Sequence, residues 1–381
     1  MASIRKAKTK SGEARWVAHY RDPSGKPREK WFLRKIDAEQ YARRIATDVD
    51  RGRYTDPRAG KISFAEWSAS WLNTKADRKP KTLEGYRSLL DNHVLPVFGP
   101  RSLSSIRPEE ISVWIANLKL SGLSASRVRQ AFNVLNGCLG MAAAFDRIPR
   151  NPAANVAVRS TIPSPVSGEM KFLSLDQLLA LSDAAPQPYE TLIMTLGISG
   201  IRWGEAVALR RRRIDLLGKR LHIAESMAEI KGGLSFGSPK SGHDRWVNIP
   251  AFLRDDLEVR LQSVAPDPDA LVFTTATKTP LRNSNFTQRI WRPTLNQAGL
   301  PTNLRIHDMR HTAASLMIAE GAPITLVQRQ LGHSSVVTTQ RYAHLYPTQG
   351  EELGDRLDQT FRSTRRADVG LGVSRLTPIA Q

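Results

Sequence analysis

"LGHSSVVTTQRYAHL", residues 331–345, places a histidine directly after a glycine and a tyrosine nine positions later. The stretch predicts His333 beside a tight glycine turn and Tyr342 on the helix that follows. Little charge separates the two residues, although the chain as a whole is strongly basic. A tyrosine placed in this way in a basic protein is a candidate catalytic residue. The rest of the chain indicates which reaction it could take part in.

Length and composition limit the class of protein. The 381 residues are 40% hydrophobic and 24% charged, so they can bury a sizeable core and form two or three domains. The 56 Lys and Arg against 36 Asp and Glu give a formal charge of +20, and the pI is near 10.4. This charge favours a polyanionic partner, nucleic acid first. An anionic membrane is disfavoured because no apolar run approaches the ~18 residues of a membrane span.

The N-terminus and the cysteine content indicate an intracellular protein. "MASIRKAKTK" is positively charged, but no apolar stretch follows it, so it is not a secretory signal. Cys138 is the single cysteine, which excludes an internal disulfide and a cysteine-based zinc site. We therefore expect a cytoplasmic protein in a reducing compartment.

Residues 1–58 are predicted to form a small β-sheet with one helix packed on it. Apolar and polar residues alternate on both sides of "DPSGKP" in residues 15–33, the pattern of a β-hairpin with a Pro/Gly turn. Residues 37–52 have helical spacing and end at a glycine. Basic residues outnumber acidic ones two to one here, which fits either a DNA-contacting module or a solvated face. The candidate DNA contacts are Arg5, Lys6, Lys8, Lys10 and Arg15.

Residues 61–155 are predicted to form an all-helical domain. The expected helices are residues 63–72, 82–99, 107–120 and 124–145. Ser63 with Glu66 fits a capping box, and Pro108 suits a first helical position. The turn-rich segment 156–170 is expected to be an extended linker to the next domain.

Residues 171–350 form the largest predicted domain, which mixes long helices with a few strands. Ser174 with Gln177 resembles a second capping box, and strands are expected within 220–226 and 245–250. Residues 351–381 are expected to be a C-terminal tail that either packs on a neighbouring subunit or frays.

Two stretches of this domain supply basic groups that look ordinary when taken alone. In "GIRWGE", residues 200–205, Arg202 and Glu205 lie three apart on one helix face, which fits an exposed ion pair. In "SPKSGHDR", residues 238–245, turn composition precedes an alternating strand, so Lys240 is expected at or near a hairpin tip. Lys231, in the same strand-rich region, is the alternative lysine.

A third stretch, "HDMRHTAASLMIAEG" at residues 307–321, places His307 and Arg310 on one side of a helix whose later apolar residues face a core. His311 lies four residues after His307 and raises the question of a zinc site. We reject that site, because Asp308 stands where a zinc-protease helix has glutamate and no third ligand is evident. A solvated helix N-terminus is the simpler alternative.

Together, these groups suffice to attack a phosphodiester without a metal. Two arginines can neutralise the charge that builds on the nonbridging oxygens, and a lysine can protonate the departing 5′ oxygen. A tyrosine hydroxyl, whose ordinary pKa is about 10, needs nearby positive charge and a proton acceptor, which the arginines and His307 can supply. The phosphotyrosine product keeps the energy of the broken strand, so we expect no ATP, metal or other cofactor.

The order and the rough intervals of these stretches resemble the signature of tyrosine recombinases, specifically integrases of the phage type. "GIRWGE", "SPKSGHDR", "HDMRHTAA" and "LGHSSVVTTQRYAH" carry the resemblance. It implies a catalytic set of Tyr342 as nucleophile, Arg202 and Arg310 as the phosphate clamp, Lys240 as general acid, and His307 and His333 as assisting groups. It also implies that Glu205 orients Arg202. Tyr346 is the alternative nucleophile, which the pattern disfavours.

The resemblance spans nearly the whole chain and implies its organisation. The fold class is multidomain α+β: a small arm-type DNA-binding domain at 1–58, an all-α core-binding domain at 61–155, and a mixed, mainly α catalytic domain. The implied function is to integrate and excise a phage or other mobile element through a covalent 3′-phosphotyrosine. The implied partners are double-stranded DNA with core and arm sites, three further copies in a homotetramer, a host DNA-bending protein and an excision directionality factor. The implied location is the nucleoid DNA of a bacterial host cell.

Two other classes of protein are considered. A type IB topoisomerase uses a similar set of groups, but the arm-like module and the short chain argue against it. A catalytically silent DNA-binding regulator would be favoured if one of the six catalytic groups were missing, and none is missing.

Overall fold

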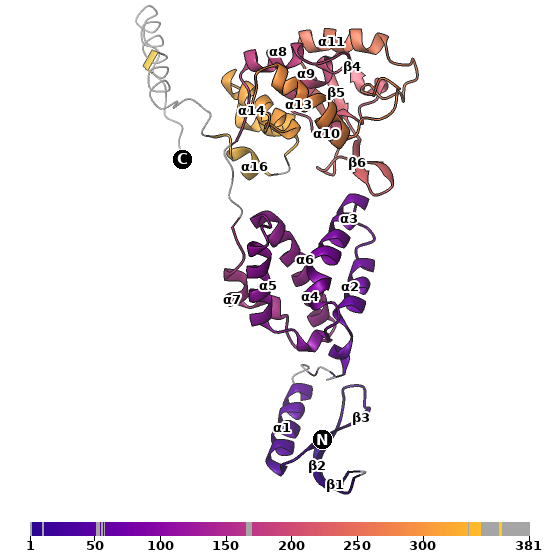
Figure 1. The fold of residues 1–381 in the computed structure, drawn as a ribbon, viewed down its shortest axis with the longest axis vertical. Helices are drawn as coiled ribbons and strands as arrows, with labels where there is room; N and C mark the ends of the chain where they lie inside the picture. Colours follow the sequence, from indigo (N-terminus) through magenta and orange to yellow (C-terminus); the bar gives the residue numbers. More distant parts are fainter. Residues whose placement is uncertain are drawn as a thin grey trace, which may run out of the picture. The chain divides into compact units, whose positions relative to one another are not determined.

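The computed structural model describes residues 2–9, 11–50, 54, 56, 58–164, 170–333, 335–343 and 358–359. Three predictions lie outside these residues: the DNA contact of Lys10, the alternative nucleophile Tyr346 and nearly all of the tail at 351–381. The chain divides into two compact units, Met1–Gly168 and Glu169–Gln381, whose elements are drawn in Figure 1. No helix in the described part of the chain is long and apolar enough to cross a membrane.

The first unit begins with a three-stranded antiparallel sheet in the order β1-β2-β3. Its strands are β1 (Ser3–Lys8), β2 (Ala14–Arg21) and β3 (Pro27–Phe32). The predicted β2–β3 hairpin is confirmed, with Trp16 opposite Phe32. Strand β1 was not predicted. Only Ile4 and Ala7 of this strand are partly buried, and the cationic residues around them obscure the alternation of apolar and polar residues that is typical of a strand. Helix α1 (Lys35–Asp50) packs on the sheet, as expected.

The rest of the first unit is helical (Figure 1). Its α-helices are α2 (Phe64–Asn73), α3 (Pro80–Leu89), α4 (Leu95–Phe98), α5 (Pro108–Leu120), α6 (Ala125–Ala144) and α7 (Val156–Ser160). The capping box of Ser63 and Glu66 is confirmed, and Pro108 is the first residue of α5. The helix predicted at 82–99 is divided by a π-helical segment, Leu90–Val94. Pro96 accounts for the division, because it has no N–H to continue the α-helical hydrogen bonds.

The segment predicted to be an extended linker begins with a helix. Helix α7 follows Asn155, whose side chain accepts a hydrogen bond from the backbone N–H of Ala157. Val158 on α7 is 1% exposed and belongs to the core of the helical domain. The prediction was wrong for residues 156–160, because an asparagine N-cap and one buried valine were enough to add a short helix to that core.

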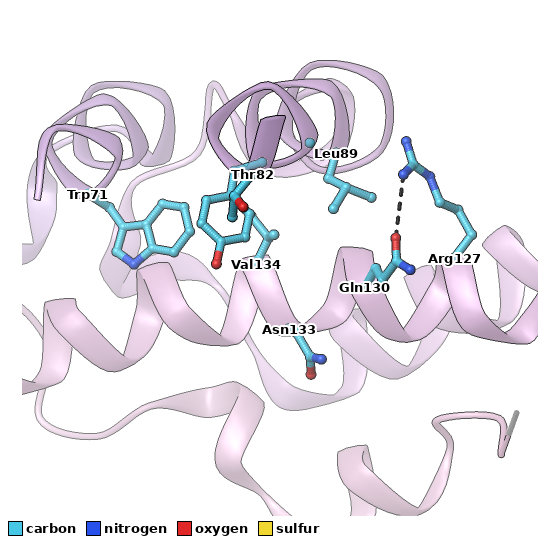
Figure 2. Close-up of a pocket in the computed structure, with 9 residues that line it drawn as sticks. Trp71, Thr82, Leu89, Arg127, Gln130, Asn133 and Val134 are labelled. Atoms are coloured by element: carbon cyan, nitrogen blue, oxygen red, sulfur yellow. Dashed lines mark hydrogen bonds between the residues drawn. The ribbon is translucent and has the colours of Figure 1, made fainter. Parts of the chain in front are cut away.

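A cavity of about 360 Å³ opens in the helical domain between α3 and α6 (Figure 2). Trp71, Leu89 and Val134 form its apolar wall, while Arg127 and Gln130 are hydrogen-bonded to each other at 3.5 Å. Arg127 is the one charged side chain among its lining residues. The lining therefore offers no acid–base pair, and the candidate chemistry lies elsewhere.

The second unit packs helices around a central, almost wholly buried α9 and adds two small sheets. Its α-helices are α8 (Leu175–Asp183), α9 (Glu190–Ser199), α10 (Trp203–Ala206), α11 (Ala251–Gln262), α12 (Asn283–Phe286), α13 (Arg292–Gln297), α14 (Met309–Ala319), α15 (Ile324–Leu331) and α16 (Val336–Gln340). Strands β4 (Ile214–Asp215), β5 (Arg220–Ile223) and β8 (Arg245–Asn248) form one antiparallel sheet in the order β4-β5-β8. Strands β6 (Ser226–Ile230) and β7 (Gly233–Gly237) form a hairpin. The capping box of Ser174 and Gln177 is confirmed.

Two placements differ from those predicted. Lys240 is not at the tip of a hairpin. The β6–β7 hairpin turns at Lys231 and Gly232, and Lys240 lies in the connection from β7 to β8. Strand β8 pairs with β5 and not with β7. Tyr342 is not on a helix, because α16 ends at Gln340 and the tyrosine follows it in a turn. Both differences follow from strand pairings and helix ends that the local composition does not determine.

Candidate active site

The second unit contains a cavity of about 330 Å³ that gathers the residues singled out in the sequence. It is lined by Arg202, Lys240, Ser241, His307, Arg310, His311, Gly332, His333, Thr338, Arg341 and Tyr342. All six predicted catalytic residues are among them, although they come from segments spread over 141 positions of the sequence, from Arg202 to Tyr342. Among the described residues, no group of three or more His, Cys, Asp or Glu side chains is placed to hold a metal ion.

Arg202 is held by a carboxylate that is completely buried. Glu205, whose side chain is 0% exposed, accepts hydrogen bonds from the Arg202 backbone N–H at 2.9 Å and from its guanidinium at 3.0 Å. Arg245 on β8 donates two more, at 2.8 and 3.2 Å, to the same carboxylate. Burial alone would raise the pKa of Glu205, but the hydrogen bonds and charge of Arg245 and Arg202 lower it below its ordinary value. Glu205 is therefore a buried anion that is hydrogen-bonded to two arginines.

Sequence reasoning missed Arg245. Arg245 is the last residue of "SPKSGHDR" and the first residue of the strand that follows the loop of Lys240. The motif therefore contained Arg245, but no role was predicted for it. Its partner Glu205 lies 40 residues earlier, and only the fold brings the two side chains together. An arginine at the start of an alternating strand was the available signal.

Arg310 is buried and fixed by backbone carbonyls at the ends of two helices. It is 3% exposed and donates to the carbonyl of Gly200 at 2.7 Å and to that of Leu331 at 2.6 Å. Gly200 ends α9 with a positive φ of 67°, and a Cβ there would lie 2.4 Å from Leu331 Cδ2, so glycine is required. Burial, and then the positive charge of Arg202, lower the pKa of Arg310 to about 9. The guanidinium thus stays cationic at neutral pH and is poised to bind an anion.

His333 is positioned by the glycine turn that was predicted beside it. Gly332 ends α15 with φ 68°, and the His333 backbone N–H then donates to the Gln328 carbonyl at 3.1 Å. The His333 Nδ1 lies 2.9 Å from the hydroxyl of Thr339 on α16. Burial, and then the charge of Arg310, lower the pKa of His333 to about 3, so the ring is neutral at physiological pH.

His307 lines the cavity and is exposed. It belongs to a short 3-10 turn, Ile306–Asp308, that leads into α14. Partial burial of its ring, and then the rings and charges of His311 and Arg310, lower its pKa to about 4. His307 is therefore neutral at physiological pH and can accept a proton.

The tyrosine hydroxyl contacts a histidine to which the sequence analysis gave no role. Tyr342 is 2% exposed, and its Oη lies 2.7 Å from Nδ1 of His311 on α14. Burial raises the pKa of Tyr342, against a lowering by Arg310 and Arg341. His311 had been considered only as a zinc ligand, and its contact with Tyr342 depends on the return of the chain through α15 and α16.

The predicted DNA contacts of the N-terminal sheet lie far from this chemistry along the chain. Arg5, Lys6 and Lys8 are exposed on β1, and Arg15 on β2 is partly buried. Arg15 donates to Glu13 at 2.6 Å, and Arg5 donates to His19 at 2.7 Å. The ammonium group of Lys6 lies over the Trp16 ring, 6.0 Å from its centroid, and Lys8 is exposed at the end of the strand.

Comparison with protein families gives two matches. Residues 171–349 match the phage integrase family, and residues 63–119 match the N-terminal SAM-like domain of phage integrases. The first match contains all six catalytic residues predicted from the sequence.

Individual relatives and solved structures agree with these matches. The chain is 29% identical over 356 residues to a putative prophage phiRv2 integrase of Mycobacterium tuberculosis, covering 91% of this chain and 92% of the relative. It is 25% identical over 331 residues to the ICEBs1 integrase of Bacillus subtilis, covering 81% and 87%. The Tn1549 transposon integrase in complex with a circular intermediate DNA matches with a TM-score of 0.67 at 16% identity, covering 78% of this chain and 99% of that one. A lambda integrase tetramer bound to a Holliday junction matches with a TM-score of 0.57 at 18% identity, covering 87% and 95%.

The fold, the cavity and these matches define the class of protein. The chain belongs to the phage integrase family of tyrosine recombinases. It is therefore a DNA strand-transferring enzyme, and the multidomain α+β fold class predicted from the sequence is confirmed.

Proposed function

We propose that this integrase cuts one DNA strand at a defined site by attack of Tyr342, holds the strand as a 3′-phosphotyrosine, and rejoins it to a new partner. The proposal rests chiefly on one observation: a single cavity gathers a buried tyrosine hydroxyl, two arginines, a lysine and two neutral histidines. Repeated on paired sites, this reaction integrates a phage or other mobile element, and a directionality factor turns it toward excision.

The scissile phosphate binds between Arg202 and Arg310. Arg310 is cationic, desolvated and fixed by two carbonyls, so it needs no rearrangement as charge grows on the nonbridging oxygens. Glu205 holds Arg202 by its backbone and its side chain, which leaves the other face of the guanidinium for the phosphate. A planar guanidinium can make two parallel hydrogen bonds to phosphate oxygens, which fixes the orientation of the reacting phosphorus.

The departing 5′ oxygen takes its proton from Lys240. The lysine is exposed in the loop before β8 and lines the cavity, so its ammonium group can reach a phosphate bound there. A loop position lets the lysine move with the substrate and reprotonate afterwards. His307 and His333, both neutral before DNA binds, donate hydrogen bonds to the phosphate.

The other parts of the chain bind DNA around this centre. The helical domain and the catalytic unit bind the core site, and the sheet of β1 to β3, through Arg5, Lys6, Lys8, Lys10 and Arg15, binds arm sites. The Tn1549 integrase has been solved with a circular intermediate DNA and lambda integrase as a tetramer on a Holliday junction, which supports DNA binding and a homotetramer here. A host DNA-bending protein brings the arm and core sites together on the bacterial nucleoid, in the cytoplasm.

A trapped covalent complex tests the proposal. The substrate is a duplex from the DNA flanking the gene, nicked a few nucleotides beyond the scissile phosphate so that the freed 5′-hydroxyl fragment diffuses away. Without metal or ATP, the wild type is expected to give a band that resists denaturant, and Tyr342→Phe is expected to give none. Tyr189→Phe, on the same unit but outside the cavity, is the matched control and keeps the band.

Two outcomes would contradict the proposal. A band that survives in Tyr342→Phe would move the nucleophile, most simply to Tyr346. A wild-type band with supercoil relaxation but no strand exchange between two duplexes would indicate a topoisomerase instead of a recombinase.

A further inference from the structure

The hydroxyl of Tyr342 is aimed by one short hydrogen bond. Its Oη lies 2.7 Å from Nδ1 of His311, and the two ring centroids are 5.7 Å apart with the planes tilted by 54°. His311 is 7% exposed and also lines the cavity that holds Arg202 and Arg310. Both residues of the pair therefore line the cavity in which the two arginines lie.

The rest of the tyrosine ring is held by apolar packing. Tyr342 belongs to a cluster with Ala314 and Ile318 of α14 and with Val327 and Leu331 of α15. The Tyr342 backbone N–H donates to the Thr339 carbonyl at 2.9 Å. Because the ring and the backbone are both fixed, the side-chain torsions leave the hydroxyl few positions other than the one beside His311.

The surroundings of His311 keep the imidazole uncharged before DNA binds. The groups whose charge acts on it are Asp308, Arg341, Arg305 and Arg310, with the ring of His307 packed at 5.8 Å. Burial is the largest cause that lowers the pKa of His311, and the three arginines add to it against Asp308. A neutral imidazole with its proton on Nε2 presents a lone pair at Nδ1. In that tautomer the lone pair faces the tyrosine hydroxyl, 2.7 Å away.

We propose that His311 is a catalytic residue: its Nδ1 orients the Tyr342 hydroxyl and accepts the hydroxyl proton during attack. This inference rests on the proposed function, and it assigns to His311 the base role that the sequence alone had given to His307. As the bond from Oη to phosphorus forms, the proton moves to Nδ1. The bond from phosphorus to the 5′ oxygen breaks, and Lys240 gives that oxygen a proton. In rejoining, the imidazolium returns its proton to the departing tyrosine oxygen.

The same contact accounts for the protonation state of the tyrosine in the free enzyme. The pKa of the phenol is raised and that of the imidazole is lowered, so the proton stays on Oη in the free enzyme. A phosphate bound in the cavity brings negative charge next to Arg310 and Arg341, two of the arginines that oppose protonation of His311. Bond formation to phosphorus then makes Oη more acidic as Nδ1 becomes more basic, which couples proton transfer to the presence of the substrate.

The test compares rates of covalent complex formation on the nicked duplex. His311→Ala removes both the hydrogen bond and the base, and His311→Asn can keep a hydrogen bond through its Oδ1 but cannot carry the proton. Both are expected to slow the reaction about 100-fold or more, the usual effect of losing a general base. Added imidazole is expected to restore part of the rate in His311→Ala but not in His311→Asn. His222→Asn is the matched control, a histidine of the β4-β5-β8 sheet outside the cavity, and keeps the wild-type rate.

A second substrate separates the base from the acid. With sulfur in place of the bridging 5′ oxygen, the leaving group needs no proton. Lys240→Ala should then recover, whereas His311→Ala should stay slow. Recovery of both variants, a rate within threefold of wild type for His311→Asn, or a faster reaction in His311→Ala would overturn the inference; the last result would mean that His311 restrains the tyrosine. Failure of the wild type to form the complex would instead contradict the proposed function.

Discussion

Removing Arg245 should destabilise the second unit by about 3–5 kcal/mol. Arg245→Met deletes two hydrogen bonds to Glu205, at 2.8 and 3.2 Å, and one to the Gln330 carbonyl at 3.4 Å. The Arg245 side chain is 10% exposed and that of Glu205 is 0% exposed, so a buried carboxylate loses one of its two cationic partners. Breaking a buried pair from one side costs about this much, because the remaining charge is left desolvated. A methionine keeps most of the packing volume.

The loss of unfolding free energy in Arg245→Met should depend on pH, because it depends on the charge of Glu205. Its pKa in the folded protein is lowered, so it contributes stability above its unfolded pKa of about 4.3, and this contribution is lost as pH falls through the folded pKa. Without Arg245, burial dominates and the pKa of Glu205 rises. The difference between wild type and Arg245→Met should therefore be largest at pH 7 and shrink toward pH 4, where protonation removes the buried charge in the variant.

Hydrogen exchange in increasing urea, read on peptides from α9 and α14, measures this loss in the second unit apart from the first. Arg254→Met is the matched control, because Arg254 pairs with the exposed residues Asp255 and Glu258 and such pairs contribute about 0–1 kcal/mol. A loss below 1 kcal/mol for Arg245→Met at pH 7, or a loss that grows as pH falls, would refute the reasoning.

Two further predictions concern the turn beside His333. Gly332→Ala should cost about 1–3 kcal/mol in urea unfolding, because φ is 68° and the new Cβ would lie 2.6 Å from Arg245 Nε, whereas Gly237→Ala, which meets open space, should stay within about 0.5 kcal/mol. His333 has a folded pKa of about 3, below its unfolded value of about 6.5, so the unfolded state binds more protons between these pH values and stability should fall as pH drops below 6.5. His333→Gln should flatten that slope in titrations of unfolding free energy, and an unchanged slope would contradict the assignment.

The residues of the site could be predicted where local spacing decides their geometry. Arg202 and Glu205 lie three apart, and the expected i,i+3 contact forms at the start of α10. The same spacing brought His307 and Arg310 into one cavity. The alternative considered for this stretch alone, an exposed ion pair, does not hold, because the Glu205 side chain is 0% exposed and also pairs with Arg245 on β8.

The rest of the site depends on contacts between distant segments. Arg245 reaches Glu205 across 40 positions, and His311 reaches Tyr342 across 31. Neither pairing leaves a periodic pattern in the sequence. The fold was likewise predictable at the hairpin and the capped helices but not at Pro96, where a missing N–H turned one expected helix into three pieces. The local sequence therefore did not predict the side-chain contacts between distant segments or the interruption of a helix near a proline.

The most direct test of the account is to identify the residue that carries the DNA. The trapped complex is digested with nuclease and trypsin, and fragment ions locate the nucleotide adduct on the peptide. Cleavage after Arg341 gives a peptide that begins at Tyr342 and also contains Tyr346, so the fragments distinguish the two. The account predicts a phosphodiester on Tyr342. An adduct on Tyr346, or on any residue outside the cavity, would contradict it.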